Sequence, residues 1–163
     1  MVALKVEDVR SFTSKLFVKE DFDRFLVKEI NIITYNSFTI DGHVRQGYYT
    51  QEELEENRIE DFSSWKVLKP LCFSLIKGKK LPGSFHIVLS LAPGDVEKFA
   101  SSLGTGIDGG QIQGLYLNIR YEDGALYCIT GTSLNFFTLD KTLETEWDNA
   151  VKDFMRSHEI VCT

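Results

Sequence analysis

The sequence is poor in proline and cysteine, with three residues of each among 163. So few prolines, together with 12% aromatic residues, exclude a low-complexity or disordered chain. Cys72, Cys128 and Cys162 form no C-x-x-C pair, and their odd number and wide spacing do not indicate a disulfide framework. No apolar run approaches the roughly 18 residues of a membrane span, and no long apolar segment follows a basic start. We therefore expect a cytoplasmic protein that is neither secreted nor embedded in a membrane.

Positive charge is in deficit, because 18 lysines and arginines face 24 aspartates and glutamates, leaving a net charge of −6. The surface as a whole repels phosphate backbones, so any contact with nucleic acid or an anionic membrane requires a local basic patch. A chain of this length with 43% hydrophobic residues can bury a core without disulfides or metals. We expect a single domain over residues 1–163.

Residues that would signal catalysis or metal binding are also scarce. His43, His86 and His158 stand alone, without an H-x-x-x-H pair or a cysteine-rich cluster. The sequence therefore predicts no metal site and no cofactor. Residues 104–109 satisfy G-x-G-x-x-G, but they follow a predicted helix and precede a predicted strand, the reverse of a dinucleotide-binding loop. We interpret them as a flexible loop.

Helical periodicity and capping patterns predict helices near residues 8–17, 63–77, 93–103 and 140–158, and a short helix from residue 50. Pro70 is expected to kink or restart the second of these helices, and Asp140 to cap the last. Alternation predicts strands near residues 2–6, 26–32, 37–40, 43–49, 85–91, 115–121, 126–130 and 134–136. Lys28 is placed on the face of Ile30 and Ile32, and Gly42 is expected to supply a turn with positive φ.

Asp123-Gly124 is a strong hairpin signal between two alternating segments. The register that it implies sets Arg120 against Tyr127 on the outer face of a sheet. It also leaves Cys128 as a buried, inert residue rather than a nucleophile with a histidine partner. The side chains expected in the core are Leu115, Leu117, Ile119, Leu126 and Cys128.

The two halves of the sequence match at a nearly constant offset, which indicates an internal repeat. Asp8, Val9 and Phe12 have identical partners 87 residues later, and Gly42 has one 89 residues later. The alternative is that any two segments of the same secondary structure match through periodicity alone. We predict an α+β fold of duplicated βαβββ units forming antiparallel sheet, with helices packed on one face. The repeats span about residues 2–49 and 84–139, with a helical insertion over about 50–82 and a C-terminal helix over about 140–158.

A βαβββ unit used twice resembles one domain of the DNA sliding-clamp superfamily. The segment 124–134, Gly-Ala-Leu-Tyr-Cys-Ile-Thr-Gly-Thr-Ser-Leu, is similar to the clamp segment in which a strand ends in a T-G-T-D-L-like turn. As a whole, the chain also resembles members of an uncharacterised family from anaerobic Firmicutes. The clamp resemblance implies helices that present cations to DNA phosphates. Arg10, Lys15 and Lys19 would take this role in the first helix, whereas the second helix offers only Lys98.

The helical insertion over about 50–82, which connects the two predicted repeats and is called the connector below, has the most distinctive charge pattern. No acidic residue occurs from Phe62 to Gly94, whereas the segment just before it is rich in glutamate. We expect weak, salt-sensitive binding of anions here at most, and the alternative is that the lysines pair with the acidic helix or are solvated. The lysines of this segment are Lys66, Lys69, Lys77, Lys79 and Lys80.

These observations favour a non-catalytic binding or scaffold protein with a clamp-like fold. Another protein or a second copy of the chain is the expected partner, and weak contact with nucleic acid stays open. The alternative is a small enzyme with a site near His86 and the lysine-rich connector, since a single sequence does not show which residues meet in space.

Overall fold

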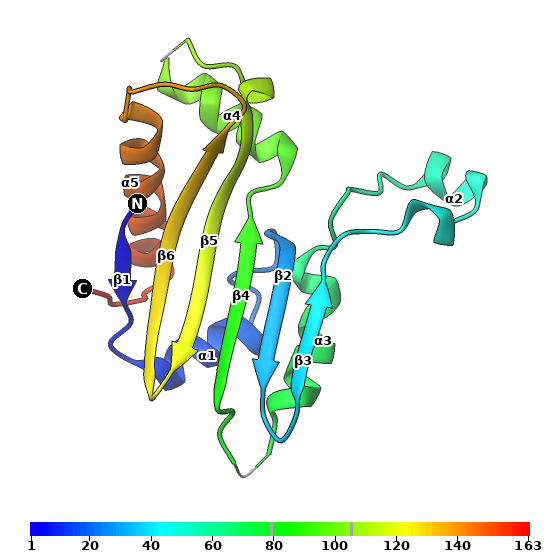
Figure 1. Ribbon diagram of the computed structural model, residues 1–163, viewed down its shortest axis with the longest axis vertical. Coiled ribbons are helices and arrows are strands. Elements are labelled where there is room, and N and C mark those ends of the chain that lie inside the picture. Colours follow the sequence, from blue (N-terminus) through cyan, green and yellow to red (C-terminus); the bar gives the residue numbers. More distant parts are fainter. Residues whose placement is uncertain (79, 105) are drawn as a thin grey trace.

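A computed structural model describes residues 1–78, 80–104 and 106–163, which form an α+β fold around one six-stranded antiparallel sheet. The strands lie in the order β1-β6-β5-β4-β2-β3, so the sheet is open and has β1 and β3 at its edges (Figure 1). The strands are β1 (Ala3–Lys5), β2 (Leu26–Ile33), β3 (Ser37–Asp41), β4 (Ser84–Ser90), β5 (Ile112–Glu122) and β6 (Ala125–Leu134). The α-helices are α1 (Val9–Phe17), α2 (Gln51–Glu56), α3 (Trp65–Ile76), α4 (Pro93–Leu103) and α5 (Thr142–Ser157), and the 3-10 helices are η1 (Gln46–Tyr48) and η2 (Gly109–Gln111).

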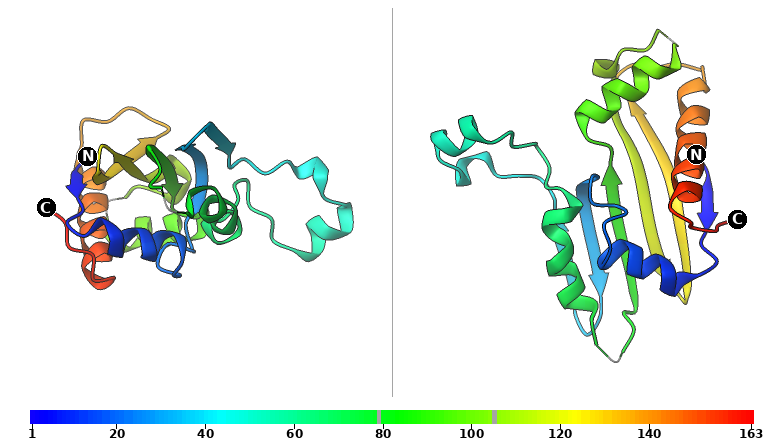
Figure 2. Two further views of the ribbon diagram at one scale, coloured as in Figure 1. Left: turned by 90° about the horizontal axis from the view of Figure 1, so that it is seen from below. Right: turned by 180° about the vertical axis from the view of Figure 1, so that it is seen from behind.

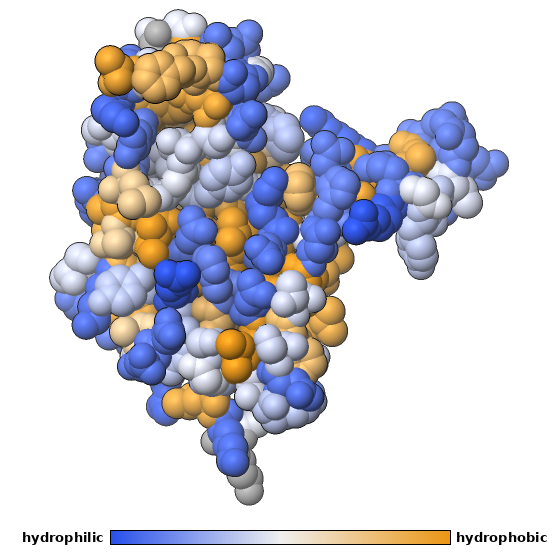
Figure 3. Space-filling view, viewed as in Figure 1, coloured by the Kyte–Doolittle hydropathy of each residue, from blue (hydrophilic) through white to orange (hydrophobic). Residues whose placement is uncertain are grey.

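Helices α1, α3, α4 and α5 cover one face of the sheet and leave the other face open (Figure 2). Alternation along the strands explains this asymmetry, because Leu117 and Ile119 of β5 point into the core while Asn118 points to the open face. The open face is mixed, with hydrophilic side chains interspersed with hydrophobic patches (Figure 3). The predicted α+β class, with its helices on one face, the helical insertion and the C-terminal helix, is confirmed.

The β5–β6 hairpin has the predicted register. Arg120 pairs with Tyr127 and Ile119 with Cys128. The turn residues Asp123 and Gly124 have φ values of 52° and 77°, as a two-residue turn between right-twisted strands requires. All five side chains assigned to the core of this hairpin are buried.

The register of β2 differs from the prediction around Lys28. A β-bulge between Val27 and Glu29 leaves Lys28 without a partner on β4, so Val27 and Ile30 share the core face instead. The ammonium group of Lys28 lies 3.9 Å from the ring centroid of Phe62 on the other side of the sheet. Lys28 therefore does not share the core face with Ile30 and Ile32, because the extra residue of the bulge turns its side chain outward.

The duplication of the two halves is not confirmed. Each half does contain a strand, a helix and two further strands, but β1 lies at an edge next to β6 whereas β4 lies inside the sheet between β5 and β2. The third strand expected at 43–49 is wrong: His43 makes one isolated bridge to Phe62, and η1 follows. The further strand expected through Leu134 and Phe136 is also wrong, because Leu134 is the last residue of β6 and Phe136 is not in a strand.

Gly42 is required for a different reason from the one expected. Its φ is not among the positive values of the described residues. A Cβ at this position would lie 1.8 Å from the carbonyl oxygen of Val27, so the backbones of two segments cross here at a distance that only glycine permits. Gly131 has ordinary contacts, so the match between these two glycines does not reflect a shared structural role.

Residues 44–61 form an arm that projects from the sheet next to β3 and α3 (Figures 1 and 2). Backbone hydrogen bonds from Val44 to Asp61 and from Ser63 to Gly42 close the base of the arm. At its tip lies α2, where Thr50 and Glu53 form the predicted capping box. No residue of α2 is buried, so this helix contributes nothing to the core.

The cysteines differ in burial, and this gives the first prediction. Burial raises the pKa of all three thiols, that of Cys72 to about 12, but only Cys162 is partly exposed to solvent. At pH 8 we expect a disulfide reagent such as 5,5′-dithiobis(2-nitrobenzoate) to label only Cys162 in the folded protein. The other two thiols should react only in guanidinium, and labelling of all three in the native state would contradict the packing.

Candidate binding cleft

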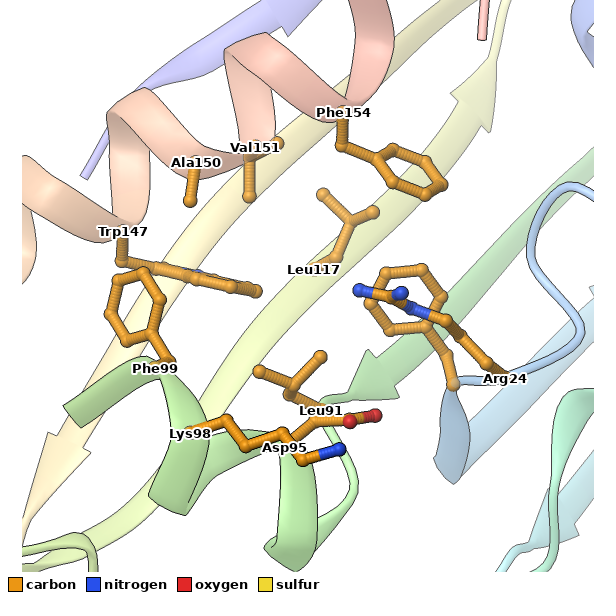
Figure 4. Close-up of a pocket in the computed structure, with 11 residues that line it drawn as sticks. Arg24, Leu91, Asp95, Lys98, Phe99, Leu117, Trp147, Ala150, Val151 and Phe154 are labelled. Atoms are coloured by element: carbon orange, nitrogen blue, oxygen red, sulfur yellow. The ribbon is translucent and has the colours of Figure 1, made fainter. Parts of the chain in front are cut away.

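A cleft of about 370 Å³ lies between α4, α5 and the loop that leads from α1 into β2 (Figure 4). Its floor is the helix-covered face of the sheet, where Leu117 of β5 and Leu91 after β4 are both buried. The residues that line it are Arg24, Phe25, Leu91, Asp95, Lys98, Phe99, Leu117, Trp147, Ala150, Val151 and Phe154.

Aromatic pairs form the two ends of the cleft. Phe99 of α4 meets Trp147 of α5 edge to face with ring centroids 5.7 Å apart, and Phe25 meets Phe154 in the same way at 5.4 Å. The Trp147 indole N–H donates a hydrogen bond of 3.0 Å to the carbonyl oxygen of Tyr116, which fixes this wall to β5. The cleft therefore has rigid apolar walls.

Arg24, Asp95 and Lys98 lie at the rim of the cleft, among the apolar side chains (Figure 4). Asp95 and Lys98 are one turn apart on α4, whose start is set by Pro93 in its first turn. In the part of the chain that the structure describes, none of the three takes part in an ion pair. The guanidinium carbon of Arg24 lies 6.0 Å from the ring centroid of Phe25. The rim thus carries two cations and one anion without a partner of opposite charge among the described residues.

Comparison with protein families gives one match. The model of DUF5721, a family of unknown function, matches residues 15–162. The chain belongs to this family. No curated protein and no solved structure matches the chain. The resemblance to an uncharacterised family is therefore supported, whereas membership of the sliding-clamp superfamily is not confirmed.

Next to the cleft, this DUF5721 member has a second, more polar hollow that shares Arg24 and Phe154 with it. Here His158 Nδ1 lies 2.8 Å from a carboxylate oxygen of Asp21, and the imidazole ring lies against Phe154 with ring centroids 4.1 Å apart and planes tilted by 35°. The pair ties the end of α5 to the loop after α1. The two residues are 137 positions apart, so no local pattern in the sequence could indicate this contact.

Two of the cations assigned to an anion site in this DUF5721 member already have partners inside the protein. Lys69 is buried, and its ammonium group donates to the Asp23 carboxylate at 2.6 Å and to the Lys19 carbonyl at 2.8 Å. Lys15 donates to the carbonyl oxygens of His158 and Glu159. These two lysines hold loops and the end of α5 in place.

The remaining cations of the predicted set are exposed but dispersed. Lys66 lies near the start of α3, Lys77 and Lys80 follow its end, and Arg10 lies on α1; Lys79 lies outside the described residues. The structure shows no ion pair between the described lysines and the acidic arm. Anion binding by Lys77 and Lys80 stays a prediction, and pairing with the arm of the same chain does not occur for the lysines described.

His86 does not meet the connector lysines on one surface. It lies on the open face of the sheet in β4, between Asn31 of β2 and Arg120 of β5, whereas α3 packs on the opposite face. Among the described residues, no group of three or more histidine, cysteine or acidic side chains could hold a metal ion. Within the same part of this DUF5721 member, no helix has both the length and the apolar character of a membrane span.

Proposed function

We propose that the protein is a non-catalytic binding protein whose α4–α5 cleft holds a small amphipathic anion. The observation that carries this proposal is the combination of a buried apolar floor with Arg24 and Lys98 at the rim, neither of which forms an ion pair among the described residues. Small-molecule sites are typically concave and apolar, with a few polar groups that fix orientation. A volume of about 370 Å³ falls in the usual range for such sites.

The charges at the rim favour an anionic head group. Two cations and one carboxylate leave one net positive charge at the rim, beside the apolar lining of the cleft. Charge-assisted hydrogen bonds from such cations are stronger than hydrogen bonds between neutral groups. Arg24 is suited to a carboxylate because its guanidinium group can bind both oxygens at once. A ligand with an apolar chain or ring and one carboxylate fits both the apolar floor and the cationic rim of the cleft.

The composition of the lining supports binding rather than catalysis. The described residues that line the cleft include no serine, cysteine, threonine or histidine. The lining thus offers apolar contact and charge, without the nucleophile and adjacent base that acyl or glycosyl transfer requires.

Calorimetric titration with decanoate and with its neutral analogue decanamide tests the proposal. We expect the wild type to bind decanoate more tightly, because only the carboxylate can use Arg24 and Lys98. Arg24→Gln and Lys98→Gln should each reduce decanoate affinity by about tenfold, the size expected for one charge-assisted hydrogen bond, with little change for decanamide. Ala150→Phe should block both ligands by filling the cleft.

Lys152→Gln is the matched control, because Lys152 is exposed on α5 and does not line the cleft. It removes one positive charge from the same helix and should leave both affinities unchanged. An equal loss of decanoate affinity in Lys152→Gln and Lys98→Gln would show that binding depends on the net charge of the protein and not on a contact with Lys98. The absence of decanoate binding by the wild type would contradict the proposal for this ligand class.

A further inference from the structure

We propose that two copies of this chain associate in antiparallel fashion through α3, with the acidic arm of each copy on the lysine-bearing end of α3 in the other. This interface lies away from the α4–α5 cleft and goes beyond the function proposed for it. The proposal rests on three features of one side of the molecule: the arm, the exposed face of α3 and the lysines that follow α3.

The tip of the arm packs against no other part of the described chain, although Arg45 at its base pairs with Asp41 of β3 at 3.6 Å. This tip, α2, has six residues, buries none of them, and projects away from the sheet (Figure 2). A helix this short is marginal in water by itself, so a surface that packs against it would stabilise it. The side chain of Tyr48 beside it is 84% exposed, which adds an unburied aromatic ring to the arm.

The charge of the arm selects the kind of surface that it fits. Four of the six residues of α2 are glutamates, and the described residues give none of them an ion pair with a lysine or arginine. Figure 3 shows the arm as a mainly hydrophilic projection. An acidic surface of this kind is complementary to a basic surface, and the chain itself carries one. The glutamates are Glu52, Glu53, Glu55 and Glu56.

The basic surface is at the other end of α3. The arm leads into the start of α3 at Ser64, and Lys77 and Lys80 follow its last residue, Ile76. Twelve residues of α-helix separate the two ends by about 18 Å, and the arm projects away from α3 (Figure 2), so it does not lie against these lysines in the described structure. Lys77 and Lys80 are exposed, and the described structure gives neither of them an ion pair.

Between the acidic and the basic end, α3 exposes an apolar stripe. Val67 and Leu71 are one turn apart on the same face, with 69% and 51% of their surfaces exposed. The opposite face of the helix packs Trp65 and Cys72 into the core. Next to α3, β3 is an edge strand with one side unpaired in the described sheet.

This arrangement is self-complementary under a two-fold rotation. A patch that is acidic at one end, apolar in the middle and basic at the other matches its own copy when that copy is turned end to end. In this orientation each arm projects over the Lys77–Lys80 end of the other copy, and the two apolar stripes face each other. A second copy therefore satisfies all three features at once.

Sedimentation equilibrium on charge-reversed variants tests the proposal. One variant carries Glu52→Lys, Glu55→Lys and Glu56→Lys, and the other carries Lys77→Glu and Lys80→Glu. We expect the wild type to dimerise and each variant alone to dimerise at least about tenfold more weakly, because like charges then face each other at both ends. An equimolar mixture of the two variants should dimerise again, since both contacts become complementary.

Two further variants make the result specific. Leu71→Glu should weaken dimers of the wild type and of the mixture, whereas Lys5→Glu with Lys152→Glu, a charge change away from α3, should leave the wild-type dimer intact. Circular dichroism checks that each variant is folded. A monomeric wild type at low salt, or variants whose mixture does not regain dimerisation, would overturn the proposal, and the first result would instead favour a different basic partner for the arm.

Discussion

Replacing Trp147 with alanine should lower the free energy of unfolding by about 3–5 kcal/mol, the usual cost of removing a large buried aromatic side chain. Trp147 is 4% exposed and packs against Phe99, and its indole N–H binds the carbonyl oxygen of Tyr116. The substitution therefore removes apolar contacts and a part-buried hydrogen bond to the Tyr116 carbonyl. Urea denaturation at constant m-value gives the difference directly.

Trp147→Phe is the control for this prediction, because it keeps an aromatic ring against Phe99 and removes the hydrogen bond. We expect Trp147→Phe to lower the free energy of unfolding by much less than Trp147→Ala does. If Trp147→Ala cost less than about 1 kcal/mol, α5 would not be anchored through this side chain, and the wall of the cleft would not be rigid.

Replacing Lys69 with methionine should be the second large perturbation. The ammonium group of Lys69 and the carboxylate of Asp23 are 2.6 Å apart, with only 11% and 15% of their side chains exposed. Removing one partner of a buried ion pair leaves the other charge uncompensated, so we expect a loss of about 3 kcal/mol in chemical denaturation.

Lys66→Met is the matched control, because it changes an exposed lysine on the same helix and should cost less than about 0.5 kcal/mol. The double variant Lys69→Met/Asp23→Leu should recover part of the stability, since no buried charge then remains. Equal effects of Lys69→Met and Lys66→Met would show that the pair contributes no structural energy. A solvated, anion-binding role for Lys69 would then be the better interpretation.

Local patterns in the sequence were sufficient where the structure is local. The Asp123-Gly124 turn specifies the β5–β6 hairpin, and the stripe containing Trp147 and Val151 specifies the buried face of α5, because periods of two and 3.6 residues identify the face that is buried. The capping box at Thr50 also marks the start of α2 correctly. Each of these features depends on residues that are close in the chain.

Features that depend on distant segments were not predictable in the same way. The bulge that turns Lys28 outward depends on pairing with β4, and the place of β1 beside β6 depends on contacts between the two ends of the chain. The strand expected at 43–49 was wrong because alternation shows which face could be buried, not whether another strand is available to pair.

The residues of the candidate cleft were not predictable as a group, because they come from segments that are distant in the chain. Arg24, Lys98 and Trp147 come from three segments that no spacing rule connects, so the sequence shows Trp147 only as part of the core and Lys98 as a lone cation on its helix. The connector lysines were the more visible feature, since they are close together in the chain. Lys69 of that group is nevertheless buried with Asp23, which only the packing of α3 against the loop after α1 could reveal.

Chemical-shift mapping with decanoate on ¹⁵N-labelled protein tests the central claim, that the α4–α5 cleft is the binding site. We expect shifts confined to residues around the cleft, including the Trp147 indole N–H and the backbone of Leu91 and Phe99, with Lys77 and Lys80 unaffected. Shifts centred on Lys77 and Lys80, or a spectrum unchanged at millimolar decanoate, would contradict the assignment of the binding site to this cleft.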